Sequence, residues 1–206
     1  MPRKPQVTRE ERRQAIEPRL MDAALRLMTD GESFTELSID RLATEAGISR
    51  ATFYIYFEDK GDLMRRIATR VFTELADDAQ QWWDVIGRHD PHDVELAMQR
   101  IIASYRRHQT FITALNEMSS YDATVAATYR QLLGDISAGL AEVIRNGQND
   151  GSIRPGLPAG ATASALTWMV ERACHQNLPY QPTDLDAELS SALAQITWGA
   201  LYSDKP

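Results

Sequence analysis

Apolar side chains recur every three or four residues along most of the chain, and this periodicity limits the possible folds more than any other feature. Leu63, Ile67, Val71 and Leu75 form one such stripe, and another runs from Leu132 to Ile144. The spacing places these side chains on one face of an α-helix, whereas a half-buried strand would alternate apolar and polar residues. No segment shows that alternation. The sequence therefore predicts an all-α protein.

Glycine, proline and polar residues divide the helical pattern into about nine expected helices. These helices are expected at residues 18–30, 38–46, 49–56, 59–86, 96–108, 110–120, 129–149, 161–178 and 185–202. Pro18 would remove a backbone donor inside a helix, so we expect the first main helix to begin near it. Thr8 and Glu11 form a possible capping box for an earlier start. The layout is three short helices near the N-terminus, followed by a larger helical bundle.

The composition is that of an ordinary globular protein, with 43% hydrophobic and 25% charged residues among 206. Such a length suggests one or two domains. Cys174 is the single cysteine, so the chain can form neither an internal disulfide nor a cysteine-based zinc site. The residues through Gln14 are mostly polar, and no apolar run is long enough to span a bilayer. We expect a cytoplasmic protein with no membrane partner.

Residues 38–60 read SIDRLATEAGISRATFYIYFEDK, which has the spacing of a helix-turn-helix. Ser38 and Ser49 are good N-caps for the two short helices. Gly47 lies between them and tolerates the left-handed turn at little cost. Leu42 and Phe53, with neighbouring apolar residues, can pack the two helices together. The pattern therefore predicts a helix-turn-helix rather than two unrelated helices.

This packing leaves hydroxyl and arginine side chains on the outward N-terminal side of the second short helix, namely Ser49, Arg50, Thr52 and Tyr54. In helix-turn-helix proteins that part of the second helix enters the major groove of DNA. Hydroxyls and arginine suit both phosphate oxygens and base edges. The residues alone therefore indicate a DNA-binding surface.

The stretch GISRATFYIYFEDKGDL resembles the TetR family of bacterial transcriptional repressors, and the resemblance covers about residues 15–70. Within that family, ISRATFYIYF and LTWMVER (Leu166–Arg172) are similar to the ethionamide-regulator branch. Thr167 and Val170 stand where that branch has polar asparagines in its pocket helix. The resemblance implies a basic arm over 1–14, a three-helix DNA-binding domain over 15–61 and a ligand-binding and dimerisation domain over 62–206.

The resemblance also implies contacts with double-stranded operator DNA. The residues that it assigns to DNA are Thr35, Ser38, Ser49, Arg50, Thr52, Tyr54, Tyr56 and Lys60. Lys60 would bind a phosphate together with the N-terminus of the long helix, whose amides favour an anion. The aromatic residues here could instead be core. We expect core positions for Phe53 and Phe57, and a DNA contact for at least one of the two tyrosines.

The formal net charge of −7 at first argues against a nucleic-acid partner, but the acidic excess is unevenly placed. Residues 1–60 carry ten basic and eleven acidic side chains, whereas residues 61–206 carry twelve and eighteen. The basic residues of the N-terminal arm are Arg3, Lys4, Arg9, Arg12 and Arg13. Such an arm can enter the minor groove beside a helix-turn-helix, and a solvated tail is an equal alternative.

The C-terminal part is rich in aromatic residues, and all four tryptophans lie in it. A bundle of this kind can hold an apolar or aromatic ligand, although an ordinary packed core explains each residue equally well. In the family this domain holds an inducer, and the residues expected to line the pocket are Phe111, Leu115, Met118, Tyr129, Trp168 and Met169. The last two helices carry many alanines, and in the family they pair with their symmetry mates to form a homodimer.

Candidate catalytic chemistry is sparse. The run His89-Asp90-Pro91-His92-Asp93 has metal-ligand residue types, but it lies in a proline-containing loop where Asp93 can cap a helix. Cys174 and His175 are neighbours on a helix and point in different directions, so they cannot form a nucleophile–base pair. We therefore expect no enzyme, no catalytic residue, no metal and no cofactor.

Together these features predict a homodimeric repressor that an apolar small molecule releases from a pseudo-palindromic operator. One alternative is an activator, or a regulator with no small-molecule ligand. Another is an all-helical enzyme or carrier of apolar ligands whose helix-turn-helix is incidental.

Overall fold

The computed structural model describes residues 8–83 and 90–202, and these residues form helices and the turns between them. The elements are α1 (Arg9–Thr29), α2 (Ile39–Glu45), α3 (Arg50–Tyr56), α4 (Lys60–Trp83), α5 (Pro91–Ser119), α6 (Ala123–Asp150), α7 (Ala159–Asn177), the 3₁₀-helix η2 (Thr183–Leu185) and α8 (Asp186–Leu201). No strand occurs in the described ranges, so the predicted all-α class is confirmed.

The first helix begins at Arg9, and the prediction of a start near Pro18 is wrong. Thr8 Oγ1 accepts from Glu11 N at 3.1 Å, and Glu11 Oε2 accepts from Thr8 N at 2.6 Å. This capping box satisfies two of the backbone donors that a helix start leaves unpaired, and Pro18 is accommodated inside the helix. Residues 9–14, which the resemblance places in the arm, are therefore helical.

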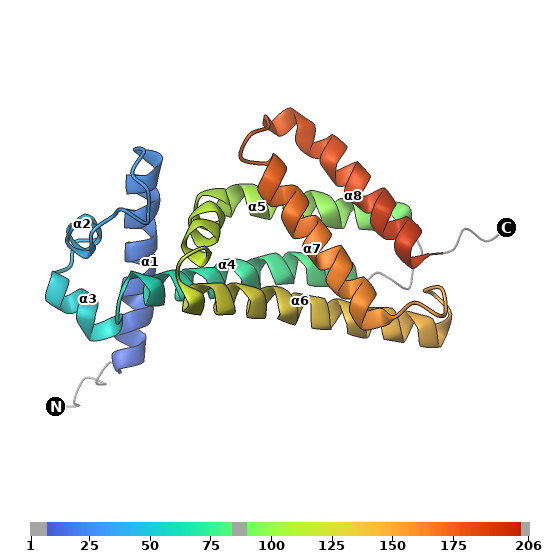
Figure 1. Cartoon of the computed structure of the whole chain (residues 1–206), viewed down its shortest axis with the longest axis horizontal. Helices are drawn as coiled ribbons and strands as arrows, with labels where there is room; N and C mark the ends of the chain where they lie inside the picture. The colour runs from blue at the N-terminus through green and yellow to red at the C-terminus, as the bar shows by residue number, and fades with distance from the viewer. Residues whose placement is uncertain (1–7, 84–89, 203–206) are drawn as a thin grey trace, which may run out of the picture.

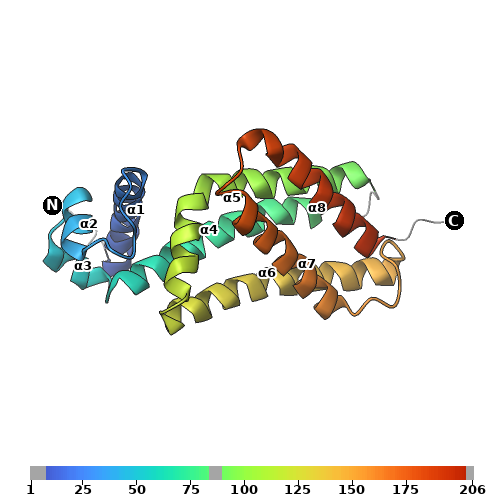
Figure 2. The same cartoon turned by 45° about the horizontal axis from the view of Figure 1, so that its top comes forward.

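The segments expected as two helices, 96–108 and 110–120, belong to the single helix α5. No glycine or proline interrupts residues 105–112, and Tyr105, Phe111 and Ile112 are buried along this stretch. The helix bends instead of breaking (Figure 2). Its N-cap is Asp90, whose Oδ1 accepts from His92 N at 2.9 Å, so the expected capping role of Asp93 is wrong. His89 lies outside the described residues.

The helices form a small N-terminal domain, α1 to α3, joined by the long helix α4 to a bundle (Figure 1). In the bundle α4 packs against α5 and α6, α7 packs against α6, and α8 packs against α5. Leu63, Ile67, Val71 and Leu75 of α4 are buried, which confirms the predicted stripe. The helix α4 therefore contributes to both parts of the molecule.

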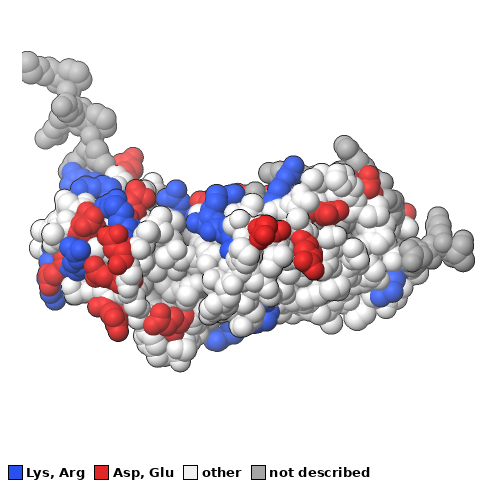
Figure 3. Space-filling model, turned by 90° about the horizontal axis from the view of Figure 1, so that it is seen from above, with Lys and Arg blue, Asp and Glu red and all other residues white. Residues whose placement is uncertain are grey.

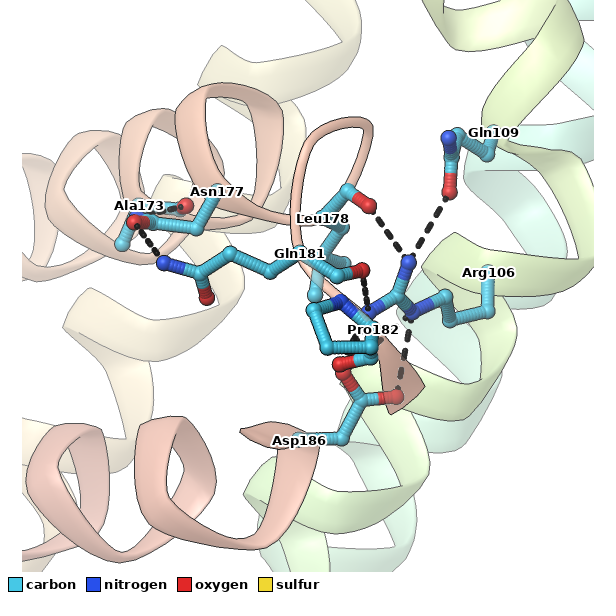
Figure 4. A network of polar contacts seen from close by, with 8 residues as sticks. All are labelled: Arg106, Gln109, Ala173, Asn177, Leu178, Gln181, Pro182 and Asp186. Atoms are coloured by element: carbon cyan, nitrogen blue, oxygen red, sulfur yellow. Dashed lines mark hydrogen bonds and ion pairs between the residues drawn. The ribbon is translucent and has the colours of Figure 1, made fainter. Parts of the chain in front are cut away.

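Arg106 of α5 fixes the connection between α7 and α8 (Figure 4). Its Nη2 donates to Asp186 Oδ1 at 2.6 Å and to the Gln181 carbonyl at 3.0 Å, and its Nη1 donates to the Leu178 carbonyl. The hydrogen bond to Asp186 raises the pKa of Arg106, which stays charged. A guanidinium with several oriented acceptors is a strong anchor, so the start of α8 is held against α5.

Charged side chains are unevenly spread over the surface. On the face shown in Figure 3, acidic and basic residues crowd together over the N-terminal domain, whereas much of the bundle is uncharged. Within residues 8–83 and 90–202, no helix is both long and apolar enough to cross a lipid bilayer.

Candidate DNA-binding surface and ligand cavity

The turn between α2 and α3 is held by backbone bonds and by an arginine of α1. Gly47 has φ +66°, a left-handed conformation that side chains with a Cβ adopt at a cost. Arg19 Nη2 donates to the Ala46 carbonyl at 2.8 Å and to the Gly47 carbonyl at 3.0 Å. A Cβ at position 47 would lie 3.2 Å from that same nitrogen, so glycine leaves room for the arginine. The first helix therefore fixes the turn geometry.

The apolar side chains predicted to join α2 and α3 are in the core. Leu42, Ala43, Phe53 and Phe57 are buried, and the rings of Phe53 and Phe57 lie 5.3 Å apart. Ile48 is half-buried and packs against the same cluster. The expectation that Phe53 and Phe57 are core residues is confirmed, and the two short helices form one packed unit with a defined outward face.

Both serines assigned to DNA serve as helix N-caps. Ser38 Oγ accepts from Arg41 N at 3.1 Å, and Ser49 Oγ accepts from Thr52 N at 3.0 Å. Ser49 Oγ also lies 2.8 Å from Thr52 Oγ1. The two serines are exposed and Thr52 is half-buried. These hydroxyls therefore lie at the N-terminal ends of α2 and α3, where backbone amides favour an anion such as a phosphate.

Arg50 and Tyr54 form the most prominent pair on α3. The Tyr54 side chain is 46% exposed, and its hydroxyl and ring lie 3.5 Å and 5.5 Å from the Arg50 guanidinium. Arg50 Nη1 also lies 2.5 Å from Asp40 Oδ2, and this hydrogen bond raises the pKa of Arg50. The guanidinium is thus charged and held at the surface, and a DNA contact would exchange Asp40 for a phosphate or base acceptor.

Lys60 and Thr35, for which the resemblance implies phosphate contacts, lie where the two domains meet. Lys60 Nζ donates to the carbonyls of Thr35 at 2.6 Å and Phe34 at 3.3 Å, and partial burial lowers the pKa of this ammonium. Thr35 Oγ1 donates to Glu117 Oε1 of α5 at 2.8 Å. A Cβ at Gly61 would lie 2.9 Å from Asp122 Oδ2, so the first turn of α4 also abuts the start of α6. The sequence did not indicate these roles for Glu117 and Asp122, because they lie far along the chain from their contacts Thr35 and Gly61.

Tyr56, the last of the expected DNA residues, is half-buried at the C-terminal end of α3. It borders a surface hollow between α1, α3 and α4 that Arg13, Tyr54 and Arg66 also line. Apart from Tyr56, the expected DNA residues fall into two groups. Ser38, Ser49, Arg50, Thr52 and Tyr54 belong to the outward side of the helix-turn-helix, whereas Thr35 and Lys60 lie at the domain junction.

The bundle contains a partly open cavity of about 90 Å³. Its walls come from α4 to α8 and consist of Phe72, Leu75, Met98, Ile101, Tyr105, Leu133, Ile136, Leu140, Leu166, Thr167, Val170, Glu171 and Thr197. Ten of these thirteen residues are hydrophobic, and the other three are Thr167, Glu171 and Thr197. The arrangement can therefore hold an apolar group between the helices.

None of the six residues expected to line a pocket is in the walls of this cavity, and one of them, Trp168, is 37% exposed. Phe111, Leu115 and Met118 are buried along α5, where the first two border a narrower space against α4. Tyr129 is buried, with its ring 5.5 Å from Phe72 and 6.5 Å from Trp168. Met169 is half-buried against the core. Their role as ligand contacts stays a prediction.

Glu171 of α7 is the charged residue in the cavity wall, and only 3% of it is exposed. Its Oε1 accepts from the hydroxyl of Tyr129 at 2.5 Å and from that of Tyr105 at 3.4 Å. Burial raises the pKa of both phenols, so they act as hydrogen-bond donors. Sequence reasoning missed Glu171, because a glutamate beside an arginine on a helix has the pattern of a solvated face.

Cys174 is unsuited to nucleophilic chemistry. The thiol is buried, and burial raises its pKa to about 12. Burial also lowers the pKa of His175. The thiolate is the reactive form of cysteine, so this environment disfavours it.

A helix-turn-helix domain joined by one long helix to a bundle with an apolar cavity defines a class of DNA-binding transcriptional regulators. Comparison with family models identifies the family within this class. A model described as "Bacterial regulatory proteins, tetR family" matches residues 20–67, and one described as "Transcriptional regulator EthR, C-terminal domain" matches residues 94–203. The chain therefore belongs to the TetR family of bacterial transcriptional regulators, in its EthR-like branch, and it is a DNA-binding regulator rather than an enzyme.

Curated relatives agree with this placement. The HTH-type transcriptional regulator EthR of Mycolicibacterium smegmatis is 27% identical over 195 residues, covering 92% of this chain and 88% of that protein. EthR of Mycobacterium tuberculosis is 26% identical over 205 residues, covering 93% of each chain. The similarity thus spans both domains.

Solved structures share the fold. A TetR-family transcriptional regulator from Mesorhizobium loti has a TM-score of 0.73 at 16% identity and covers 95% of this chain and 100% of its own. The regulator FadR from Bacillus subtilis, in complex with stearoyl-CoA, has a TM-score of 0.69 at 13% identity and covers 90% and 99%.

Proposed function

We propose that the chain is a homodimeric repressor, released from a pseudo-palindromic operator in the cytoplasm when an apolar small molecule enters its bundle. The observation that carries this proposal is the position of α4. Phe72 and Leu75 of α4 line the cavity, and Lys60 at its first turn holds the helix-turn-helix domain. One helix thus connects the expected ligand site to the expected DNA site.

The size of the cavity supports a conformational response. Ligand sites in proteins are commonly about 300–1,000 Å³. At about 90 Å³ this cavity is smaller than that, so we expect an apolar effector to displace its walls. A displacement of α4 would alter the spacing of the two recognition helices in a dimer. A ligand that favours the displaced conformer lowers DNA affinity by the same coupling free energy, typically about 1–3 kcal/mol.

Exposed apolar faces on the last two helices support dimerisation there. Ala161, Ala165 and Trp168 are exposed along α7, at the spacing of one helical face. Ile196 and Gly199 are exposed along α8, and Ile196 is 53% exposed. Small residues allow close helix packing, and a two-fold axis would place two recognition helices in successive major grooves.

The proposed domain organisation has three parts, an N-terminal arm over residues 1–14, a DNA-binding domain over 15–61 and a ligand-binding and dimerisation domain over 62–206, and residues 9–14 of the arm belong to helix α1. Residues 1–7, including Arg3 and Lys4, lie outside the described residues. A minor-groove contact from the N-terminal arm belongs to the proposal, and its basic composition supports it.

The salt dependence of operator binding tests the DNA half of this proposal. Because phosphate contacts release counterions, we expect affinity to fall by about a thousandfold between roughly 50 and 200 mM salt if each dimer makes about six such contacts. Fluorescence anisotropy with a labelled operator measures the slope. A flat plot of log affinity against log salt would contradict the phosphate contacts, and binding that no apolar compound weakens would favour a regulator without a ligand.

A further inference from the structure

The cavity wall is apolar except for three polar side chains, two from α7 and one from α8. Thr167 and Glu171 are four residues apart on α7, so they lie on the same helix face one turn apart. Thr197 reaches the cavity from α8. All three residues are more than nine-tenths buried.

These polar groups have unused hydrogen-bonding capacity. Among the described residues, Thr167 Oγ1, Thr197 Oγ1 and Glu171 Oε2 are buried and have no hydrogen-bond partner. Buried polar atoms are nearly always paired, because leaving one unpaired costs its full hydration. Three such atoms on the wall of one apolar cavity indicate a bound group that completes them.

A group that pairs with Glu171 Oε2 must be a hydrogen-bond donor. Glu171 Oε1 already accepts from Tyr129 and Tyr105, and each phenol has a single proton to give. An ionised carboxylate accepts only, so Glu171 Oε2 needs a donor that these tyrosines do not supply. Threonine hydroxyls can accept as readily as they donate, so both are compatible with the same ligand group.

The charge of the site also favours a hydrogen-bond donor, and in particular a cation. Arg172 Nε forms an ion pair with Glu171 Oε2 at 3.6 Å, which is too long for a hydrogen bond, and the Arg172 side chain is 52% exposed, so solvent screens this pairing. Among the described residues that line the cavity, Glu171 is the only acidic or basic side chain. A ligand carboxylate would face a buried carboxylate, whereas a ligand cation would pair with it.

We propose that the effector is an apolar molecule with a hydrogen-bond donor at one end, in its strongest form a protonated amine, which binds Glu171. This inference rests on the proposed function, since it names the chemical class of ligand for the same cavity. The apolar part would occupy the space between Phe72, Met98 and Leu140. Thr167, one helical turn from Glu171, would provide a further acceptor near the donor end, and Thr197 would provide one elsewhere in the same wall.

A matched series of probes separates these possibilities without any substitution. Hexylamine, hexan-1-ol and hexanoate each have six carbons in an unbranched chain and differ in the polar end group. Isothermal titration of the full-length protein at neutral pH should give the order amine, alcohol, carboxylate, with the amine at least about tenfold tighter than the carboxylate. Equal affinities, or tighter binding of hexanoate, would overturn the proposal.

Glu171→Gln tests the residue itself. Glutamine keeps an acceptor for Tyr129 and removes the charge, so the amine should lose about tenfold in affinity while the alcohol changes little. Glu188→Gln, an exposed change on α8, is the matched control and should leave all three affinities unaltered. If Glu171→Gln fails to fold by circular dichroism, the wild-type probe series still decides. An amine preference that survives in a folded Glu171→Gln would overturn the assignment.

Operator release, measured on the same samples, separates this inference from the proposed function. If hexylamine binds through Glu171 but DNA stays bound, the ligand class stands and the release mechanism fails. If hexanoate binds and releases DNA, the release mechanism stands and the donor assignment fails. If none of the probes binds, both the ligand class and the proposed pocket are overturned.

Discussion

Replacing Arg50 by alanine is expected to weaken operator binding by about tenfold to a hundredfold, because a good bidentate base contact contributes about 1–3 kcal/mol of discrimination. Arg50 lies at the start of α3, its guanidinium is exposed, and Tyr54 and Asp40 hold it in place. The sequence preference should relax at one base pair of each half-site. Competition with single-base variants of the operator measures both effects.

Arg70→Ala is the matched control for this substitution. Arg70 is an exposed arginine paired with Glu74 on the bundle part of α4, and its removal should leave the base preference unchanged. An Arg50→Ala protein with weaker binding but an unaltered preference profile would assign Arg50 to phosphate contacts. An unaltered affinity would remove it from the DNA interface.

Phe53→Ala is expected to cost about 3–5 kcal/mol in the free energy of unfolding, the range for a buried phenylalanine truncated to alanine. Phe53 is fully buried between the two short helices and packs against Phe57. Urea unfolding followed by far-ultraviolet circular dichroism measures the loss, and operator binding should disappear with the packed helix-turn-helix.

Leu25→Ala provides the comparison within the same domain. Leu25 is 38% exposed on α1, and its truncation should change stability by less than about 0.5 kcal/mol, as is usual at the surface. The four tryptophans all lie in the C-terminal part, so their fluorescence reports the bundle separately. A Phe53→Ala protein with wild-type stability would contradict the core position of this ring.

Local features of the fold could be predicted from the sequence. The caps Ser38 and Ser49, the turn at Gly47 and the buried Phe53 all follow from interactions between residues close in the chain. The failures concern competition between local effects. At Pro18 the capping box outweighed the breaker, and α5 continued where the apolar pattern weakened without a glycine or proline.

Only the part of the candidate site formed by residues close in the sequence could be predicted. Exposure of Arg50 and Tyr54 follows from helix periodicity on a short helix. The contacts of Lys60 with Thr35 and of Thr35 with Glu117 join residues 25 and 82 positions apart, and helical periodicity does not place them together. Glu171 was missed for the same reason, since only packing against α5 and α6 shows that its carboxylate is buried.

Ion pairs on the helix-turn-helix bear on how a protein with a net charge of −7 can bind DNA. Arg50 pairs with Asp40 and Arg41 pairs with Glu32, so the basic residues of this surface are partly neutralised in the free protein. Such a surface should bind random DNA weakly and depend on correctly spaced half-sites.

The most direct test of the account is the selection of binding sites from a random DNA library by the purified full-length protein. We predict enrichment of an inverted repeat whose half-site centres lie about one helical turn, or a multiple of it, apart. Scrambling either half of the selected site should abolish the complex at 200 mM salt, a condition in which phosphate contacts alone are weakened. Failure to enrich any sequence, or complexes equally stable on random DNA, would contradict a sequence-specific regulator that binds as a dimer.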